Sequence, residues 1–207
     1  MKITKYTHSC LYIEEKGLKF LFDPGIYSVQ NGLSTDLFQS LDYLLVTHEH
    51  EDHMDLDFIK KLTAKFPKII IKTNSSVVNI LREKKVNASF ESDDIVRIDE
   101  ISHEAMFDKN PPLNVAITAL NKITHVGDSF RSGITSEILA FPIQAPWGSY
   151  VEAMRKIIDL KPKYIIPIHD WHWKDEARIG FYKRSKEYLG QFDISFIDLD
   201  NNESIDI

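Results

Sequence analysis

The amino-acid sequence predicts an α/β protein with four layers, in which two mixed β-sheets pack together and carry helices on their outer faces. Three observations support this αββα sandwich. The chain begins with strand-like segments, alternates strands and helices in its middle, and then repeats that order. The segments 43–46 and 164–168 are apolar throughout, as is typical of interior strands buried on both faces. No flexible linker interrupts the chain, so we expect one domain over residues 1–207.

The first part of the chain contains mainly strand signals. Short stretches rich in β-branched and aromatic residues predict strands, and Asp23-Pro24-Gly25 is a strong breaker after the third of them. The polar stretch 27–35 contains an Asn-Gly pair and is expected to be a loop. We therefore expect strands over 1–7, 9–14, 18–22 and 43–47.

The remainder of the chain alternates between helical and strand patterns. Asp55 can cap a helix that ends near Pro67, and amphipathic helices are also expected over 75–84, 151–160 and 175–189. The acidic tail from 198 onward is expected to fray beyond the last strand. The remaining strands are expected over 68–72, 95–98, 114–120, 123–126, 138–142, 164–168 and 194–199.

Composition narrows the classes of partner. The net charge of −6 and the sequence pI of about 5.7 disfavour a nucleic-acid or membrane-surface partner. The N-terminus lacks the apolar segment of a signal peptide, and no apolar run approaches the roughly 18 residues that a membrane helix needs. Cys10 is the only cysteine, which excludes an intrachain disulfide. We expect a cytoplasmic protein, and the sequence leaves its oligomeric state open.

The strongest functional signal is the pattern His-x-His-x-Asp-His, directly after the apolar strand at 43–46. It places His48, His50, Asp52 and His53 within six residues, a density of imidazole and carboxylate groups that is typical of metal sites. Each histidine must be neutral to bind a metal, so the ion replaces a proton. Because Asp52 and His53 are adjacent, they must point in different directions, and one short loop can serve two neighbouring ions. A solvated loop that happens to be rich in histidine is the alternative.

This loop resembles the signature of the metallo-β-lactamase superfamily, and the resemblance covers nearly the whole chain. That family also has a later His, an Asp and a last His, each following a strand, and His103, Asp128 and His169 match them in that order. Its Asp after an N-terminal strand is matched by Asp23. The small size and the runs His-Val-Gly-Asp-Ser and Pro-Ile-His-Asp around Asp128 and His169 resemble the branch that includes the ascorbate-6-phosphate lactonases.

The resemblance implies a binuclear metal centre. Zinc is the first expectation for a nitrogen-rich site, and manganese or iron also suits imidazole and carboxylate ligands. The three ligands outside the signature loop have structural alternatives, which are, in chain order, a surface histidine, a turn residue and a buried core histidine. The family implies that one ion is held by His48, His50 and His103, that a second is held by Asp52, His53 and His169, and that Asp128 bridges the two.

Such a centre predicts hydrolytic chemistry. Two divalent ions about 3.5–4 Å apart can share a hydroxide whose pKa is lowered toward neutrality, and this hydroxide can attack a carbonyl or phosphorus centre. Asp52 is the expected catalytic side chain, since it would orient the nucleophile. No competing nucleophile is evident, because Cys10 lacks a partner and no Gly-x-Ser-x-Gly elbow occurs. The sequence therefore predicts a metal-dependent hydrolase, with two zinc ions as the first expectation, that cleaves a small ester, lactone or phosphodiester.

Five further residues are candidates for contacts with a metal ligand or the substrate. Asp23 is expected to orient a ligand through a hydrogen bond. Trp171 and His172 follow the last ligand, near the expected mouth of the cleft, where aromatic side chains shape a pocket. Arg131 could contact an anionic group, and His125 could face the pocket. Each has a structural alternative: cover over the last helix for Trp171 and His172, a solvated surface charge for Arg131, and a structural role for His125.

Other functions remain open. A nuclease or RNA-processing hydrolase would use the same chemistry, but such members of the superfamily usually carry an added domain or RNA-binding arm, for which this acidic chain has little room. A diiron oxygen- or nitric-oxide-reducing enzyme is disfavoured, because that branch has Glu at the position of His50 and a flavin domain. A metal-stabilised binding domain without turnover is the non-enzymatic alternative. Structural zinc sites usually close with four ligands, whereas seven candidates for two ions leave room for water and a small-molecule substrate, which could be anionic.

Overall fold

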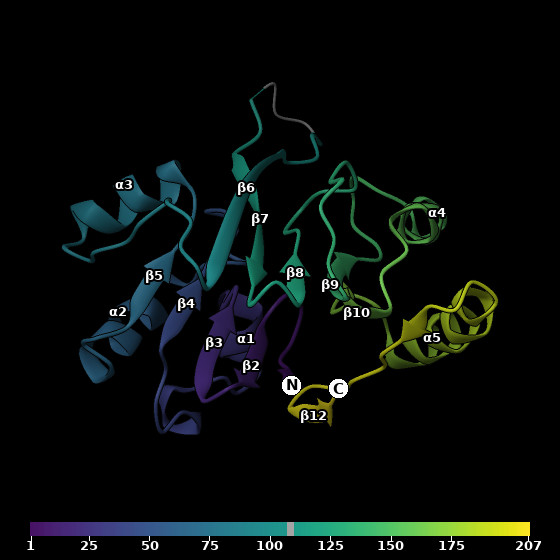
Figure 1. Ribbon diagram of the computed structural model, residues 1–207, viewed down its shortest axis with the longest axis horizontal. Coiled ribbons are helices and arrows are strands. Elements are labelled where there is room, and N and C mark those ends of the chain that lie inside the picture. The colour runs from purple at the N-terminus through teal and green to yellow at the C-terminus, as the bar shows by residue number, and fades with distance from the viewer. Residues whose placement is uncertain (107–109) are drawn as a thin grey trace. The chain divides into compact units, whose positions relative to one another are not determined.

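The computed structural model describes residues 1–106 and 110–207. They form two compact units, one made of Met1–Ser92 with Leu199–Ile207 and the other of Asp93–Asp198. Each unit contains one mixed sheet of six strands with its own helices (Figure 1). The predicted fold class, an α/β protein with two mixed sheets and helices, is confirmed. The expected single domain over 1–207 stays a prediction.

The first unit is built on a sheet with the strand order β12-β1-β2-β3-β4-β5. Its edge strand β12 and the strands β1 to β3 pair antiparallel, whereas β3, β4 and β5 pair parallel. The parallel pairing brings the carboxyl ends of β3 and β4 to one edge of the sheet, which is where the loops with Asp23 and the histidine pattern begin. The strands are β1 (Lys2–Lys5), β2 (Leu11–Glu15), β3 (Leu18–Phe22), β4 (Tyr43–Leu45), β5 (Ile70–Lys72) and β12 (Glu203–Asp206).

Two amphipathic helices of this unit begin where the sequence predicts. Helix α2 (Leu56–Lys65) is capped by Asp55, whose side chain accepts a hydrogen bond from the amide of Phe58 at 2.8 Å. Helix α3 (Ser75–Glu83) is capped in the same way by Asn74. Figure 1 shows both helices beside β4 and β5. Their apolar faces join the side chains of these strands in one core, which fixes the loop after β4 at its base. The core members from these four elements are Leu44, Phe58, Ile59, Leu62, Ile71, Val77 and Leu81.

The second unit is built on a sheet with the strand order β11-β10-β9-β8-β7-β6. The strands β6, β7 and β8 pair antiparallel, and β8 to β11 pair parallel. Helix α4 (Tyr150–Leu160) begins with a capping box between Ser149 and Glu152, and α5 (Asp175–Gly190) follows β10. The strands are β6 (Val96–Ser102), β7 (Leu113–Ala119), β8 (Ile123–His125), β9 (Ile138–Pro142), β10 (Tyr164–Ile168) and β11 (Ser195–Phe196).

Two local predictions are wrong. The stretch 27–35 is not simply a loop, because it contains the short helix α1 (Ile26–Gln30) and the start of the 3-10 helix η1 (Thr35–Leu37). Leu33 in this stretch is buried in the core of the unit, so apolar contacts compensate for its polar composition. The acidic tail does not fray, because β12 pairs with β1 in the register Ile205 opposite Ile3. That pairing depends on a strand about 200 residues away, which no local pattern reveals.

Among the residues that the structure describes, no helix has the length and apolar character required to cross a membrane. Cys10 is buried, and burial raises the pKa of its thiol well above the ordinary value.

Candidate metal centre

The first unit holds the histidine pattern in a loop that is tied to the breaker after β3. The amide of Asp23 donates to the carbonyl of Leu45 at 2.9 Å, and the amide of Ile26 donates to the carbonyl of Glu51 at 2.7 Å. The amide of Asp55 returns to the carbonyl of Pro24 at 3.0 Å. The loop is thereby fixed by backbone hydrogen bonds to residues between 22 and 31 positions earlier in the chain.

Asp23 is fully buried and organises the ligand loop through its carboxylate. Oδ1 accepts the backbone N–H of Thr47 at 2.8 Å, and Oδ2 accepts the hydroxyl of Thr47 at 2.7 Å. Oδ2 also accepts Nδ1–H of His53 at 2.7 Å. A carboxylate only accepts hydrogen bonds, so all three neighbours must be donors. This places Asp23 behind the loop, in the position of a residue that orients ligands.

These hydrogen bonds determine which nitrogen of each imidazole carries the proton. Nδ1 of His53 donates to Asp23, which leaves Nε2 without a hydrogen when the ring is neutral. The hydroxyl hydrogen of Thr47 is committed to Asp23, so its oxygen accepts from Nδ1 of His48 at 3.0 Å. His48 therefore also presents a bare Nε2. Both side chains are fully buried.

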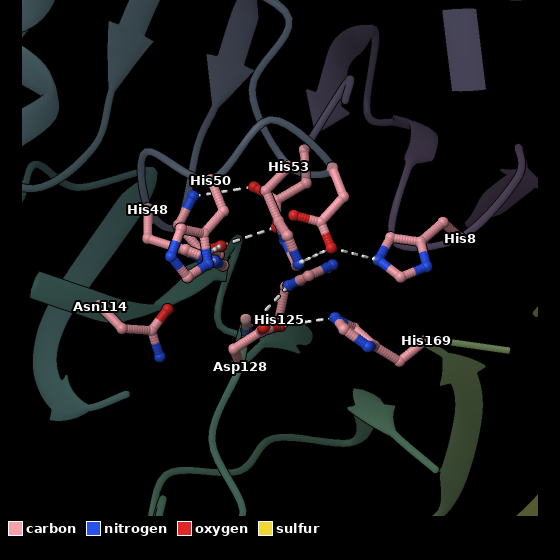
Figure 2. Close-up of polar contacts among 12 residues, drawn as sticks. His8, His48, His50, His53, Asn114, His125, Asp128 and His169 are labelled. Atoms are coloured by element: carbon pink, nitrogen blue, oxygen red, sulfur yellow. Dashed lines mark hydrogen bonds and ion pairs between the residues drawn. The ribbon is translucent and has the colours of Figure 1, made fainter. Parts of the chain in front are cut away.

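His50, the second histidine of the pattern, places a second candidate metal-binding nitrogen beside that of His48. Nδ1 of His50 lies 3.2 Å from Nε2 of His48 (Figure 2). Two ligands on one tetrahedral ion with Zn–N bonds of about 2.0–2.1 Å lie roughly 3.3 Å apart. The separation of the two nitrogens is thus compatible with a shared ion.

A histidine outside the pattern lies against Asp52. Oδ2 of Asp52 is 3.0 Å from Nε2 of His8 and 3.9 Å from Nε2 of His53 (Figure 2). Sequence reasoning missed His8, because it lies 44 positions before Asp52, in the turn between β1 and β2. The available signal was a histidine among the apolar strands of the N-terminus.

The second unit supplies three candidate ligands from the ends of three strands. His103 directly follows β6, Asp128 comes three residues after β8, and His169 directly follows β10. Nδ1 of His103 donates to the carbonyl of Glu104 at 2.6 Å, so its Nε2 is bare. His103 is only 5% exposed, which does not fit an ordinary surface histidine.

Asp128 lies between the two histidines of this unit. Its Oδ1 is 2.7 Å from Nε2 of His169 (Figure 2). Its Oδ2 is 3.5 Å from Nε2 of His103. Each carboxylate oxygen therefore faces a different imidazole. The residue after His169, Asp170, accepts a hydrogen bond from the hydroxyl of Tyr182 on α5. Burial and the adjacent Asp170 raise the pKa of Tyr182 well above its ordinary value, so this donor stays protonated.

Four residues in or beside the candidate ligands of the two units have a backbone in the left-handed region. The φ angles are +70° for His8, +41° for Asp23 and +64° for His169, and Gly127 just before Asp128 has +54°. Non-glycine residues rarely adopt this conformation, and it concentrates at functional sites where the surrounding structure enforces it. Seven other non-glycine residues among the described ones also have a positive φ and lie elsewhere in the chain, so the strained backbone accompanies the site but does not by itself mark it.

Gly25 lies directly against the backbone of the ligand loop, where a side chain would not fit. A Cβ at this position would lie 1.8 Å from the carbonyl oxygen of Asp52 and 2.5 Å from the amide of His53. We expect Gly25→Ala to displace both residues, to reduce metal affinity by about 10-fold or more and to lower the free energy of unfolding by about 1–3 kcal/mol. Metal competition titration and urea unfolding measure these effects. Gly180→Ala, which has open space around its Cβ, is the control, and equal behaviour of the two variants would contradict this packing argument.

The remaining predicted residues have distinct surroundings. His125 is fully buried, and its Nδ1 accepts the amide of Gly127 at 3.1 Å, so Nε2 carries the hydrogen. The guanidinium of Arg131 is largely exposed, and its Nε pairs with Glu104 at 3.2 Å. His172 contacts the side-chain oxygen of Gln144, and burial lowers its pKa, with His169 adding to the effect. Trp171 is exposed.

A cavity of about 560 Å³ in the second unit adjoins His103 and Arg131. Asn114 also lines it, and its Nδ2 donates to the carbonyl of Val126 at 3.0 Å. This fixes the orientation of the Asn114 side-chain amide, because the flipped amide would place its oxygen against the carbonyl oxygen of Val126. Oδ1 of Asn114 is buried without a hydrogen-bond partner among the described residues. Sequence reasoning did not single out Asn114, which reads as an ordinary strand residue.

Comparisons with known proteins identify the family of the chain. The model of the beta-lactamase superfamily domain matches residues 2–169. A UPF0173 protein of Pyrococcus furiosus is 29% identical over 82% of this chain and 83% of its own length. A protein of Carboxydothermus hydrogenoformans named as a UPF0173 metal-dependent hydrolase is 27% identical over 92% of this chain and 94% of its own.

The fold is also similar to solved structures. Igni18, described as a novel metallo hydrolase from the archaeon Ignicoccus hospitalis, has a TM-score of 0.75 at 17% identity, over 99% of this chain and 97% of its own. The family model spans well over half of the sequence, including every residue of the predicted ligand set. This chain belongs to the beta-lactamase superfamily.

Proposed function

We propose that this protein is a metal-dependent hydrolase with a binuclear centre. The observation that carries the proposal is the state of three buried histidines. His48, His53 and His103 each donate from Nδ1 to a fixed acceptor, which leaves Nε2 bare. This is the hydrogen-bonding pattern of metal-binding histidines, whose other nitrogen is held by a carboxylate, carbonyl or similar group.

The donor set fits divalent metal ions. Imidazole nitrogens and carboxylate oxygens suit zinc first, and manganese or iron as alternatives. The grouping into one pair of ions follows the family: His48, His50 and His103 for the first, Asp52, His53 and His169 for the second, and Asp128 as the bridge.

The side chains of this chain have separate tasks in hydrolysis. When bound, the metal pair would supply an activated hydroxide near neutral pH and Lewis-acid stabilisation of developing negative charge. Asp52 accepts a hydrogen bond from the attacking group and fixes its direction. Asp23 holds the imidazoles of His48 and His53 in the required tautomers.

The cavity beside His103 gives the proposal a substrate site. Its volume suits a small molecule, and Arg131 at its edge can attract an anionic group. The leading substrate is a small ester, lactone or phosphodiester. A nuclease is a weaker alternative, since the net charge of −6 does not favour binding a polyanion.

The first experiment is elemental analysis of untagged protein before and after chelation. We expect about two ions per chain, loss of hydrolysis of a panel of lactones, thioesters, phosphodiesters and β-lactams on chelation, and an unchanged far-ultraviolet circular dichroism spectrum. Re-addition of the metal restores turnover. One ion or none after reconstitution would reject the binuclear assignment. Unfolding on chelation, with no turnover at any stage, would instead favour a metal-stabilised binding domain.

A further inference from the structure

We infer that His8 is a positioning residue that holds Asp52 through a hydrogen bond from Nε2–H to Oδ2. The inference rests on the proposed function, because Asp52 is a proposed ligand of the second ion. Neither the histidine pattern nor the family comparison assigns a role to this residue. Its consequence is that the second metal position depends on a side chain from the turn between the first two strands of the chain.

The geometry of the contact defines its chemistry. Nε2 of His8 lies 3.0 Å from Oδ2 of Asp52. An ionised carboxylate has no hydrogen to give, so the imidazole is the donor and carries its hydrogen on Nε2. His8 is only 2% exposed, whereas the side chain of Asp52 is 25% exposed. A buried donor thus holds a carboxylate that water would otherwise reach and leave free to rotate.

His8 is itself fixed by its surroundings. The hydroxyl of Ser28 donates to the carbonyl of Thr7 at 2.6 Å, which ties the turn to α1. The amide of Tyr6 donates to the carbonyl of Cys10 at 2.8 Å, which joins the two ends of the turn. The ring of Tyr27 packs edge-on against the His8 imidazole, with the centroids 5.3 Å apart. The backbone of His8 is held at φ +70°. A rigid, strained turn that presents one imidazole is suited to fixing a partner side chain.

His8 differs from the proposed metal ligands in its hydrogen bonding. His48, His53 and His103 use Nδ1 as a donor and keep Nε2 bare, whereas the Nε2 of His8 is committed to Asp52. Ligand atoms of His8, Asp52 and His53 do lie within 4.8 Å of one another, so a direct ligand role for His8 is the competing assignment. The distance of 3.0 Å between Nε2 of His8 and Oδ2 of Asp52 is typical of an N–H···O hydrogen bond.

The test compares two variants with different hydrogen-bonding ability. The amide Nε2 of glutamine in His8→Gln can replace the imidazole donor, whereas His8→Leu has a side chain of similar bulk without a donor. We expect His8→Leu to weaken binding of the second ion by about 10–100-fold, with the first ion unaffected, and His8→Gln to restore most of the affinity. Competition titration with cobalt(II) measures both steps, and the cobalt(II) absorption spectrum reports the ligand set, which stays the same in both variants. Thermal unfolding of the full-length variants shows that each remains folded.

Two outcomes would overturn the inference. Equal losses in both variants, with a spectral change that indicates one nitrogen ligand fewer, would make His8 a metal ligand. Wild-type affinity in His8→Leu would show that the contact has no role. Nitrogen-15 NMR of the histidines in the purified full chain separates this inference from the proposed function. A slowly exchanging Nε2–H signal of His8 that is lost in Asp52→Ala supports the hydrogen bond even if metal analysis rejects the binuclear centre, and its absence contradicts the bond directly.

Discussion

Replacing His50 by alanine is expected to remove the first metal ion and to reduce hydrolysis by about 1,000-fold or more. A metal ion contributes several kcal/mol of transition-state stabilisation, and about 4 kcal/mol corresponds to this factor. His50 is suited to removal, because its Nδ1 lies 3.2 Å from Nε2 of His48, whereas His53 donates to the buried Asp23 and so also supports the fold. Metal content per chain and kcat/KM on the best substrate of the panel measure the effect.

The control for this variant is a neighbour in the same loop. The side chain of Glu51 is exposed, and its carbonyl, which supports the loop, is unchanged in Glu51→Gln. We expect that variant to keep wild-type metal content and activity. A His50→Ala protein with full metal content and full activity would show that the pattern His-x-His-x-Asp-His does not bind the metal through its second histidine.

The Asp23→Asn substitution is expected to disturb both the fold and the metal centre. The amide oxygen of asparagine can still accept, but its NH₂ group would face at least one of the three present donors. Each buried donor left unsatisfied destabilises the protein by about 1–3 kcal/mol. With the imidazoles of His48 and His53 no longer held, metal affinity should fall by about 10–100-fold. Urea unfolding of the metal-free chain and metal competition titration separate the two effects.

Asp57→Asn provides a matched control for the loss of charge. Asp57 is exposed and pairs with Lys60 one turn later on α2. Its substitution should change the free energy of unfolding by no more than about 0.5 kcal/mol and leave metal affinity unchanged. If Asp23→Asn also keeps wild-type metal affinity, the hydrogen bonds of Asp23 do not set the state of the ligands.

The proposed ligands of each unit lie at the same kind of position in their sheet. In the first unit the loop follows β4 at the carboxyl edge of the parallel strands. In the second unit His169 follows β10, and Asp128 follows β8, again at the carboxyl ends of parallel strands. This is the edge at which α/β sheets usually present functional side chains. Strained backbone at Asp23 and His169 then turns each side chain out of line with the strand before it.

The sequence by itself determined the elements whose signals are local. The apolar runs predicted β4 and β10, and Asp55 caps the helix that its position predicted. The spacing of histidines and an aspartate in one loop predicted metal chemistry, because ligands within six residues of one another can be recognised without knowledge of the fold. The family match covers the later ligands as well, up to His169. All of these features depend on residues that are close together in the chain or on the sequence pattern of the family.

Only the tertiary structure decided the features that join distant residues. The hydrogen bond from His8 to Asp52 spans 44 positions, and that from His53 to Asp23 spans 30. The tautomers of the histidines, the buried amide of Asn114 and the pairing of β12 with β1 depend on such contacts. Sequence patterns report which groups are present and how they alternate. They do not report which donor meets which acceptor, because a hydrogen bond depends on distance and direction in the folded chain.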